Sequence, residues 1–273
     1  LVKAAEKMTR GGNDYISAAT MGKSQIDLRN NVGGMNSAAA RLDFGTLPGL
    51  RGIIQICPST IGEAARINTQ PHLDSDGNLV GAQNCSPGYK SDLQDTVMAD
   101  GLAVPLQHVD ETCIHTVKKH LNHGKGIFDA VRLALNDHKG NFACVIGRIH
   151  EDCLYAVNQG SDLVAGLGEG FTCVSSDLSS ILPLTHKIIR IRDGEIITLW
   201  ADRVELRSIC DGLVIQRKPE TINDGQDAAH QGGFPHFMLK EIHEQPQAVR
   251  EVLQMLVDNN TVESILEKIR KAR

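Results

Sequence analysis

Residues 160–177 read GSDLVAGLGEGFTCVSSD, and this stretch decides the fold. Its apolar residues form two short runs around the glycine turn Gly168-Glu169-Gly170, which predicts two buried strands in a tight pair. Ser176-Asp177 has the residue types that cap the start of a helix, and Pro183 keeps that helix short. The segment 187–206 then alternates apolar and polar residues.

At the centre of 187–206 lies Asp193-Gly194, a dipeptide that readily adopts the positive φ angles of a two-residue hairpin turn. We therefore predict a β-hairpin about this dipeptide. Together with the strand pair of 160–177, it predicts the edge of a mainly antiparallel sheet.

Elsewhere strands and helices are grouped in blocks. Strand patterns occur at 16–20, 52–56, 78–83, 141–149 and 154–159. Helical spacing of apolar residues occurs at 1–10, 113–121 and 127–135, and a short helix is predicted within 33–40. Because the elements are grouped rather than alternating, the pattern predicts a layered α+β fold instead of a doubly wound sheet.

The last fifty residues change in character. Residues 219–233 are polar and glycine-rich, which predicts a long loop. Helical patterns follow at 237–242, at 247–257 beyond Pro246, and from Thr261 as a helix cap. We predict one domain over 1–240 and a helical linker or tail over 241–273.

Composition narrows the class of protein. The 273 residues are 41% hydrophobic and 22% charged, with a net charge of −5, so the chain can bury a sizeable core. No basic patch for nucleic acid is present, no apolar run reaches the length of a membrane helix, and the charged first residues do not resemble a signal peptide. We expect a cytoplasmic protein that binds neither nucleic acid nor membrane.

The seven cysteines lie at 57, 85, 113, 144, 153, 173 and 210. Their odd number and the absence of a Cys-x-x-Cys motif argue against a disulfide framework or a zinc ribbon, and they fit a reducing cytoplasm. We expect Cys144 and Cys173 to be small buried side chains, and we assign no metal and no cofactor. The chain starts with leucine, so we also expect residues to be missing or removed upstream.

Four runs together resemble one known family. They are GSDLVAGLGEG, SSD, ILPLTHKIIRIRDGEI and, at 234–251, FPHFMLKEIHEQPQAVRE. They are similar to the amino-terminal glutaminase domain of glutamine–fructose-6-phosphate aminotransferase (glucosamine-6-phosphate synthase), a type 2 glutamine amidotransferase of hexosamine biosynthesis. The resemblance implies a four-layer α/β/β/α sandwich of the amino-terminal-nucleophile (Ntn) hydrolase type. It also implies that ammonia from glutamine passes to a sugar-phosphate isomerase domain, which uses fructose 6-phosphate.

The resemblance locates a glutamine pocket whose catalytic parts are altered. The family's nucleophile is a cysteine at the amino terminus, and none of the seven cysteines lies near Leu1. The family run His-Thr-Arg-Trp-Ala-Thr-His-Gly-Glu corresponds to residues 55–63, so Cys57 replaces the arginine that clamps the substrate carboxylate while Thr60 is kept. Arg66, three residues beyond this run, is a candidate substitute for that arginine.

Two further positions complete the former pocket. The oxyanion-hole motif corresponds to Gln83-Asn84-Cys85, in which Asn84 is retained and Cys85 replaces a glycine. Asp110 corresponds to the acid that binds the substrate amino group; alternatively it is an acid that interacts with a helix dipole. We therefore assign no catalytic residue, and the binding positions are Thr60, Asn84, Cys85 and Asp110, with Cys57 in place of arginine.

Three hypotheses follow. We favour a non-hydrolytic glutaminase-like module, a pseudoenzyme that is structural, regulatory or binds a glutamine-like small molecule, and that associates with an isomerase-type domain, a partner protein or itself. The alternative is an active glutaminase whose nucleophilic cysteine lies upstream of Leu1. In a third hypothesis, Cys57 and Cys85, with Asp110 and His108 nearby, bind a soft divalent metal or act as redox thiols. The alternative is that both cysteines are buried or inert.

Overall fold

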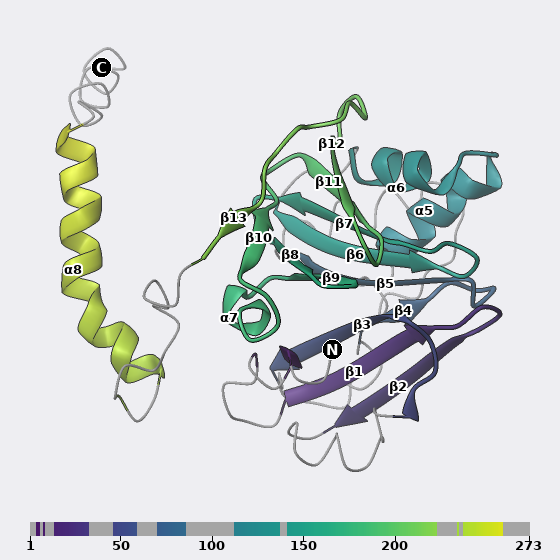
Figure 1. Ribbon diagram of the computed structural model, residues 1–273, viewed down its shortest axis with the longest axis horizontal. Helices are drawn as coiled ribbons and strands as arrows, with labels where there is room; N and C mark the ends of the chain where they lie inside the picture. Colours follow the sequence, from purple (N-terminus) through teal and green to yellow (C-terminus); the bar gives the residue numbers. More distant parts are fainter. Residues whose placement is uncertain are drawn as a thin grey trace, which may run out of the picture. The chain divides into compact units, whose positions relative to one another are not determined.

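The computed structural model describes residues 4–5, 8, 14–32, 46–58, 70–85, 112–136, 141–222, 234 and 237–258. The chain divides into two compact units, Leu1–Asp224 and Gly225–Arg273. The first unit contains the described strands, and the described residues of the second unit include a long helix (Figure 1). The domain boundary at 240/241 stays a prediction.

The described strands of the first unit form three sheets, in which neighbouring strands pair antiparallel. The six-stranded sheet has the order β12-β11-β7-β6-β5-β4, the four-stranded sheet β13-β10-β8-β9, and the three-stranded sheet β2-β1-β3. Their bounds are β1 Asp14–Met21, β2 Ile26–Val32, β3 Arg51–Pro58, β4 His72–Leu73, β5 Leu79–Cys85, β6 Phe142–Arg148, β7 Leu154–Gln159, β8 Val164–Gly168, β9 Phe171–Ser175, β10 Lys187–Arg190, β11 Glu195–Leu199, β12 Val204–Ser208 and β13 Glu220–Thr221.

Two amphipathic helices, α5 (Thr112–Asn122) and α6 (Ile127–Asn136), cover one face of the six-stranded sheet (Figure 1). Gly124, with a φ of 77°, forms the turn between them. Their apolar side chains pack on alternate strand residues, among them Cys144, Ile146, Val157 and Ile196. The helical spacing predicted for 113–121 and 127–135 is thereby confirmed.

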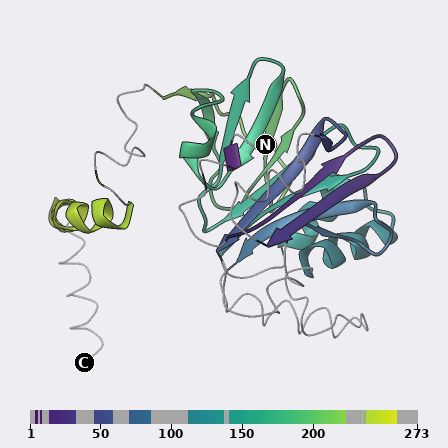
Figure 2. The ribbon, with the colours of Figure 1, turned by 90° about the horizontal axis from the view of Figure 1, so that it is seen from below.

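The opposite face of the six-stranded sheet packs against the other two sheets. Ala143, Ala156 and Ile197 contact the four-stranded sheet, and Val80 and Ala82 contact the three-stranded sheet. Two further side chains, those of Val145 and Leu154, belong to both apolar clusters. The two smaller sheets therefore share one layer (Figure 2).

Helical residues cover the outer side of that layer. Ala5 packs on Ile16 and Ala18 of β1, and α7 (Leu178–Ile181) packs through Ile181 on the four-stranded sheet. The order of layers is therefore helix, sheet, sheet, helix. This order confirms the α+β class and the four-layer sandwich expected from the sequence.

The stretch 160–177 is arranged largely as predicted. β8 and β9 pair antiparallel, and β9 is the edge strand of its sheet. Asp177 caps α7, and its carboxylate accepts a hydrogen bond from the backbone N–H of Ser179 at 2.9 Å.

The hairpin predicted about Asp193-Gly194 is wrong. Gly194 does have a positive φ of 73°, but β10 pairs with β8 and β13, while β11 pairs with β7 and β12. The turn therefore carries the chain from one layer to the other. It is held there by long-range contacts, since the Gly194 N–H donates to the Asn158 carbonyl and the Asn158 amide donates to the Ile191 carbonyl.

Three smaller differences concern the other elements. β2 was not predicted, and β13 lies inside the predicted loop 219–233. In the described part of the second unit, one continuous helix, α8 (Phe237–Asp258), runs through Pro246, although two segments were expected. The remainder of that loop, the helix in 33–40 and the cap at Thr261 lie outside the described residues.

Helix α8 exposes most of its described side chains. Apolar residues recur at helical spacing along it and are exposed in this unit: Met238, Leu239, Ile242, Val249, Val252 and Leu253. Among the described helices, α8 included, none has both the length and the apolar content needed to cross a bilayer.

Candidate functional site

The backbone of the predicted pocket is described at three positions. Cys57 is the penultimate residue of β3, and Asn84 and Cys85 are the last two residues of β5. Thr60, Asp110, His108 and Arg66 lie outside the described residues. The assignment of these side chains to a glutamine pocket therefore stays a prediction, and the question is whether the backbone brings the strand ends together.

The strands β3 and β5 start side by side, although they belong to different sheets. The Arg51 guanidinium at the start of β3 donates to the Arg148 carbonyl at 3.0 Å, and Arg148 is the register partner of Leu79 at the start of β5. Further along the two strands, Ile53 of β3 packs with Val80 and Ala82 of β5. The two strands therefore run in the same direction.

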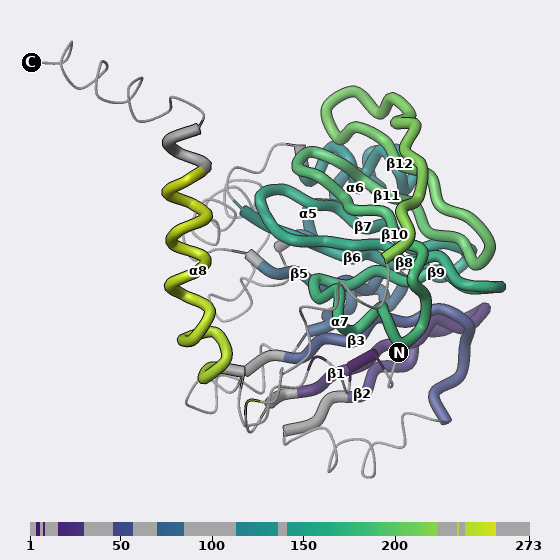
Figure 3. The backbone as a smooth tube through the Cα atoms, turned by 60° about the vertical axis from the view of Figure 1, so that its left-hand side comes forward, coloured from purple at the N-terminus to yellow at the C-terminus, as the bar shows by residue number. Residues whose placement is uncertain are grey.

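Because they run together, β3 and β5 also end at the same end of the sandwich, as Figure 3 shows. The backbone positions of Cys57 and Asn84-Cys85 lie at this end, which we call the strand-end site. Asn84 is exposed there and continues the strand face of Val80 and Ala82, which is the face turned toward the three-stranded sheet. The sequence-based grouping of these positions is thus compatible with the backbone.

A buried glutamine fixes the chain one residue before Asn84. The Gln70 side-chain amide donates to the backbone carbonyl of Gln83 and accepts from the backbone N–H of the same residue. The short strand β4 pairs only with Val80 and Gly81, so Gln70 supplies the two hydrogen bonds that a longer β4 would make. Sequence reasoning missed this contact, because side-chain-to-backbone bonds leave no periodic signal.

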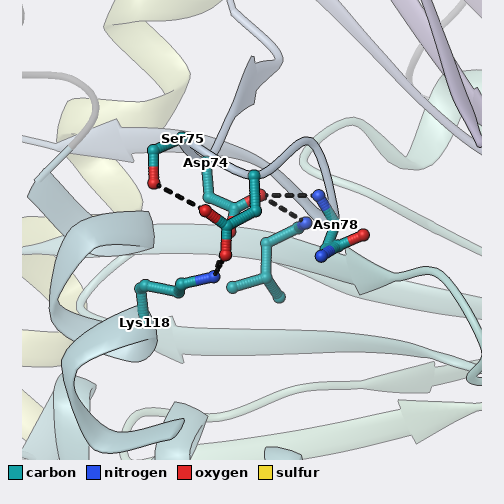
Figure 4. A network of polar contacts seen from close by, with 6 residues as sticks. Asp74, Ser75, Asn78 and Lys118 are labelled. Atoms are coloured by element: carbon teal, nitrogen blue, oxygen red, sulfur yellow. Dashed lines mark hydrogen bonds and ion pairs between the residues drawn. The ribbon is translucent and has the colours of Figure 1, made fainter. Parts of the chain in front are cut away.

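A charged network connects α5 to the turn before β5 (Figure 4). The Asp74 carboxylate accepts from the backbone N–H groups of Asn78 and Leu79, at 2.7 and 2.8 Å. The Lys118 ammonium of α5 lies 2.9 Å from Asp74 and also binds Asp76. No periodic pattern in the sequence predicts this link between the turn and α5.

The same network shifts the pKa values of two of its side chains. The hydrogen bond from Lys118 lowers the pKa of the exposed Asp76 carboxyl, and the charge of Lys118 adds to this effect. Conversely, the hydrogen bond to Asp76 raises the pKa of Lys118. Since α5 begins shortly after position 110 and β5 ends at the strand-end site, this ion pair holds in place two elements that border the predicted pocket.

The chemistry available at the described positions is limited. Asn84 can donate a hydrogen bond to a ligand oxygen, whereas a thiol such as that of Cys57 cannot form the bidentate charged pair that a guanidinium makes with a carboxylate. Within the described residues, no group of three or more His, Cys, Asp and Glu side chains is arranged to hold a metal ion. The metal or redox-thiol hypothesis involves Asp110 and His108, which lie outside those residues, and it stays untested.

Comparison with known proteins identifies relatives over almost the whole chain. The chain is 30% identical over 270 residues to a glutamine–fructose-6-phosphate aminotransferase (isomerizing) of Thermococcus kodakarensis, covering 98% of the chain and 44% of the relative. It is 28% identical to the enzyme of that name from Acinetobacter baylyi, covering 96% of the chain and 42% of the relative. The chain thus spans less than half the length of these relatives. No family model matches.

Solved structures share the fold at lower identity. The glutamine phosphoribosylpyrophosphate amidotransferase of B. subtilis superposes with a TM-score of 0.64 at 14% identity, over 76% of this chain and 46% of that one. A structure described as the allosteric regulatory enzyme of purine biosynthesis gives 0.66 at 15% identity, over 76% and 45%. These are Ntn-type amidotransferase folds, as the four layers indicate. The chain is therefore a relative of the glutaminase domain of glutamine–fructose-6-phosphate aminotransferases, with the fold of the type 2 glutamine amidotransferases.

Proposed function

We propose that this chain is a glutaminase-like domain that does not hydrolyse glutamine, and that it acts as a structural, regulatory or binding module for a sugar-phosphate isomerase-type domain or partner. One observation carries the proposal. The strands β3 and β5 end together, and position 57 near the end of β3, where the family resemblance places the carboxylate-binding arginine, is a cysteine.

The energetic effect of that cysteine is large. A guanidinium forms two charged hydrogen bonds with a carboxylate, and losing a charge-assisted contact costs roughly 1.5–3 kcal/mol. That is on the order of a tenfold to hundredfold loss in affinity for the α-carboxylate of glutamine. A side chain on Cys85, in place of the family's glycine, adds bulk where the oxyanion must approach the backbone.

An active glutaminase is the second candidate. Asn84, the retained oxyanion-hole position, is exposed at the end of β5, and the sequence similarity covers 98% of the chain. In this case the nucleophilic cysteine lies upstream of Leu1, and ammonia passes to an isomerase-type domain. The names of the relatives, which act as isomerizing aminotransferases, support the link to sugar phosphates in both candidates.

The partner part of the proposal rests on α8. This helix exposes an apolar face in its own unit, and the relatives are more than twice as long as the segment they share with this chain. A further domain or a partner protein is the expected companion. Size-exclusion chromatography with light scattering on the protein with its natural ends tests for self-association.

Titration calorimetry with glutamine and with glutamate separates the two candidates. We expect the protein to bind either ligand more weakly than about 10 mM. The variant Cys57→Arg should bind glutamine at least about tenfold more tightly than Cys57→Ser, which matches the thiol in size. Micromolar binding by the unaltered protein, with release of glutamate, would favour the active glutaminase.

A further inference from the structure

The last described segment of the first unit, residues 213–222, forms a strap that joins two sheets. Its first part lies along β12, where the Ile215 N–H donates to the Leu206 carbonyl at 2.7 Å. The Leu213 carbonyl accepts there from the Ser208 N–H at 2.9 Å. The last part of the strap contains β13, which pairs with β10. Since β12 belongs to the six-stranded sheet and β10 to the four-stranded sheet, the strap connects the two sheet layers.

The strap covers a strand edge in each layer. β12 is the terminal strand of the six-stranded sheet, and Leu213 and Ile215 lie on its side away from β11. In the four-stranded sheet, β13 is the terminal strand and lies outside β10. If the strap moved away, backbone groups of β12 and β10 would lose these hydrogen-bond partners and become exposed sheet edges. The edges of both sheets therefore define a closed position for the strap.

The middle of the strap binds residues 190–195, the crossing turn that carries the chain from one layer to the other. The Arg217 guanidinium donates to both oxygens of the Glu195 carboxylate at 2.6 Å and to the Arg190 carbonyl at 2.8 Å. The same carboxylate accepts a hydrogen bond from the Arg192 N–H at 2.7 Å. Glu195 is therefore shared between the strap and the crossing turn.

Hydrogen bonds and ion pairs hold much of the strap. Most of its residues are exposed, and it packs on the apolar clusters through Ile215 and Ile222. Its contacts also include the ion pair between Arg190 and Glu220 at 2.9 Å. A segment held in this way opens at a lower free energy than the packed core. A carboxylate that is only 8% exposed, as that of Glu195 is, is unfavourable without a cation, so opening of the strap also destabilises the crossing turn.

We propose that the strap is a latch: residues 213–222 open as one unit while the sheets stay folded, and their opening releases the crossing turn. The strap is the last described part of the first unit, and the second unit starts at Gly225. A movement or a binding event that draws the chain away at this point therefore reaches the crossing turn through Arg217. This inference does not depend on whether the domain hydrolyses glutamine.

Hydrogen–deuterium exchange of the whole chain, resolved at single amides by NMR in a series of low urea concentrations, tests the latch. We expect the N–H groups of Ile215, Ile222 and Arg192 to share one opening step. Their exchange should be at least about tenfold faster than that of Val157 in the central strand β7, and it should depend less on urea, because a local opening exposes less surface than unfolding. Equal rates and equal urea dependence at all four amides would overturn the proposal. Protection of Arg192 that persists while the strap exchanges would overturn it too.

The substitution Arg217→Ala tests the tie between the strap and the crossing turn. It should speed exchange at Ile215 and at Arg192 alike by at least about tenfold, because the strap loses its charged contact. Arg203→Ala is the matched control: it removes an exposed guanidinium that lies 3.2 Å from Asp202, and it should leave both rates unchanged. Faster exchange at Ile215 with an unchanged rate at Arg192 would contradict the proposal. Because the urea series uses the unaltered protein, it decides the outcome even if Arg217→Ala does not fold.

Discussion

The side-chain amide of Gln70 binds both backbone groups of Gln83, one residue before the exposed Asn84. This contact extends the pairing of β5 past the end of the two-residue strand β4. It therefore determines where the backbone of the strand-end site lies. Substitutions at this contact and at other buried contacts of the first unit should change the free energy of unfolding by measurable amounts.

Replacing Gln70 by alanine should destabilise the first unit by roughly 2–4 kcal/mol, because two buried backbone groups lose their partners. Chemical denaturation monitored by circular dichroism measures this effect. Gln25→Ala is the matched control, since Gln25 is exposed and its side-chain amide donates to the nearby Asp27 carboxylate. An equal effect of the two substitutions would show that the Gln70 bonds do not contribute.

Lys118→Met should destabilise the protein by roughly 1–3 kcal/mol, because the Asp74 side chain is 1% exposed and would lose its cation. Asp76→Asn should have a smaller effect, since Asp76 is exposed. If both substitutions lowered the free energy of unfolding by the same small amount, Lys118 would not stabilise the buried Asp74 carboxylate.

The Lys118–Asp76 contact also predicts a pH dependence. The pKa of Asp76 is lowered from 3.8, so its contribution is present above that pH and is lost as the pH falls through the lower native value. The pKa of Lys118 is raised from 10.5, so its contribution is present below that pH and is lost as the pH rises through the higher native value. The difference in stability between the unaltered protein and Asp76→Asn should be constant from about pH 5 to 9 and shrink below pH 3.8. A difference that grew on acidification would contradict this.

Arg217 forms two hydrogen bonds with the buried Glu195 carboxylate, both at 2.6 Å, beside the turn that carries the chain between layers. Arg217→Ala leaves that carboxylate without its cation and should cost roughly 3–5 kcal/mol. Arg203→Ala, which removes an exposed partner of Asp202, should cost less than about 1 kcal/mol. Thermal melts of the two variants make the comparison, and similar midpoints would contradict it.

Gly166 lies at a close approach between β8 and its neighbours. A Cβ built there meets Ile181 at 2.6 Å, Cys173 at 2.8 Å and Thr185 at 2.9 Å. Gly166→Ala should therefore destabilise by roughly 1–3 kcal/mol, while Gly22→Ala, whose nearest contact is 3.4 Å, should change stability by less than about 1 kcal/mol. Denaturation curves that placed Gly22→Ala as the more damaging change would contradict the packing described for β8.

The sequence predicted the elements whose signals are local. The glycine turn between β8 and β9 and the cap at Asp177 depend on neighbouring residues, so they could be read directly. The Asp193-Gly194 turn was read correctly as a turn but assigned to the wrong sheet, because the partner of β10 is β8, more than twenty residues away. β2 was missed because its polar residues, in the run IDLRNNV, give a weak pattern for a half-exposed edge strand.

The candidate site was predictable only in part. Cys57, Asn84 and Cys85 were placed by resemblance to a family, and the shared end of β3 and β5 is compatible with that placement. The contacts of Gln70 and Lys118 could not be predicted, because they link residues 13 and 44 positions apart through single side chains. Whether the predicted pocket hydrolyses glutamine depends on the chemistry of its side chains, and the fold alone does not determine that activity.

Measurement of glutamate released from glutamine tests the central claim most directly. The protein should carry its natural amino terminus, confirmed by intact mass. We predict no release above the spontaneous background, and none from Asn84→Ala either. Release of many glutamate molecules per protein molecule would contradict the account. If alkylation of an amino-terminal cysteine abolished that release, the protein would be an active glutaminase.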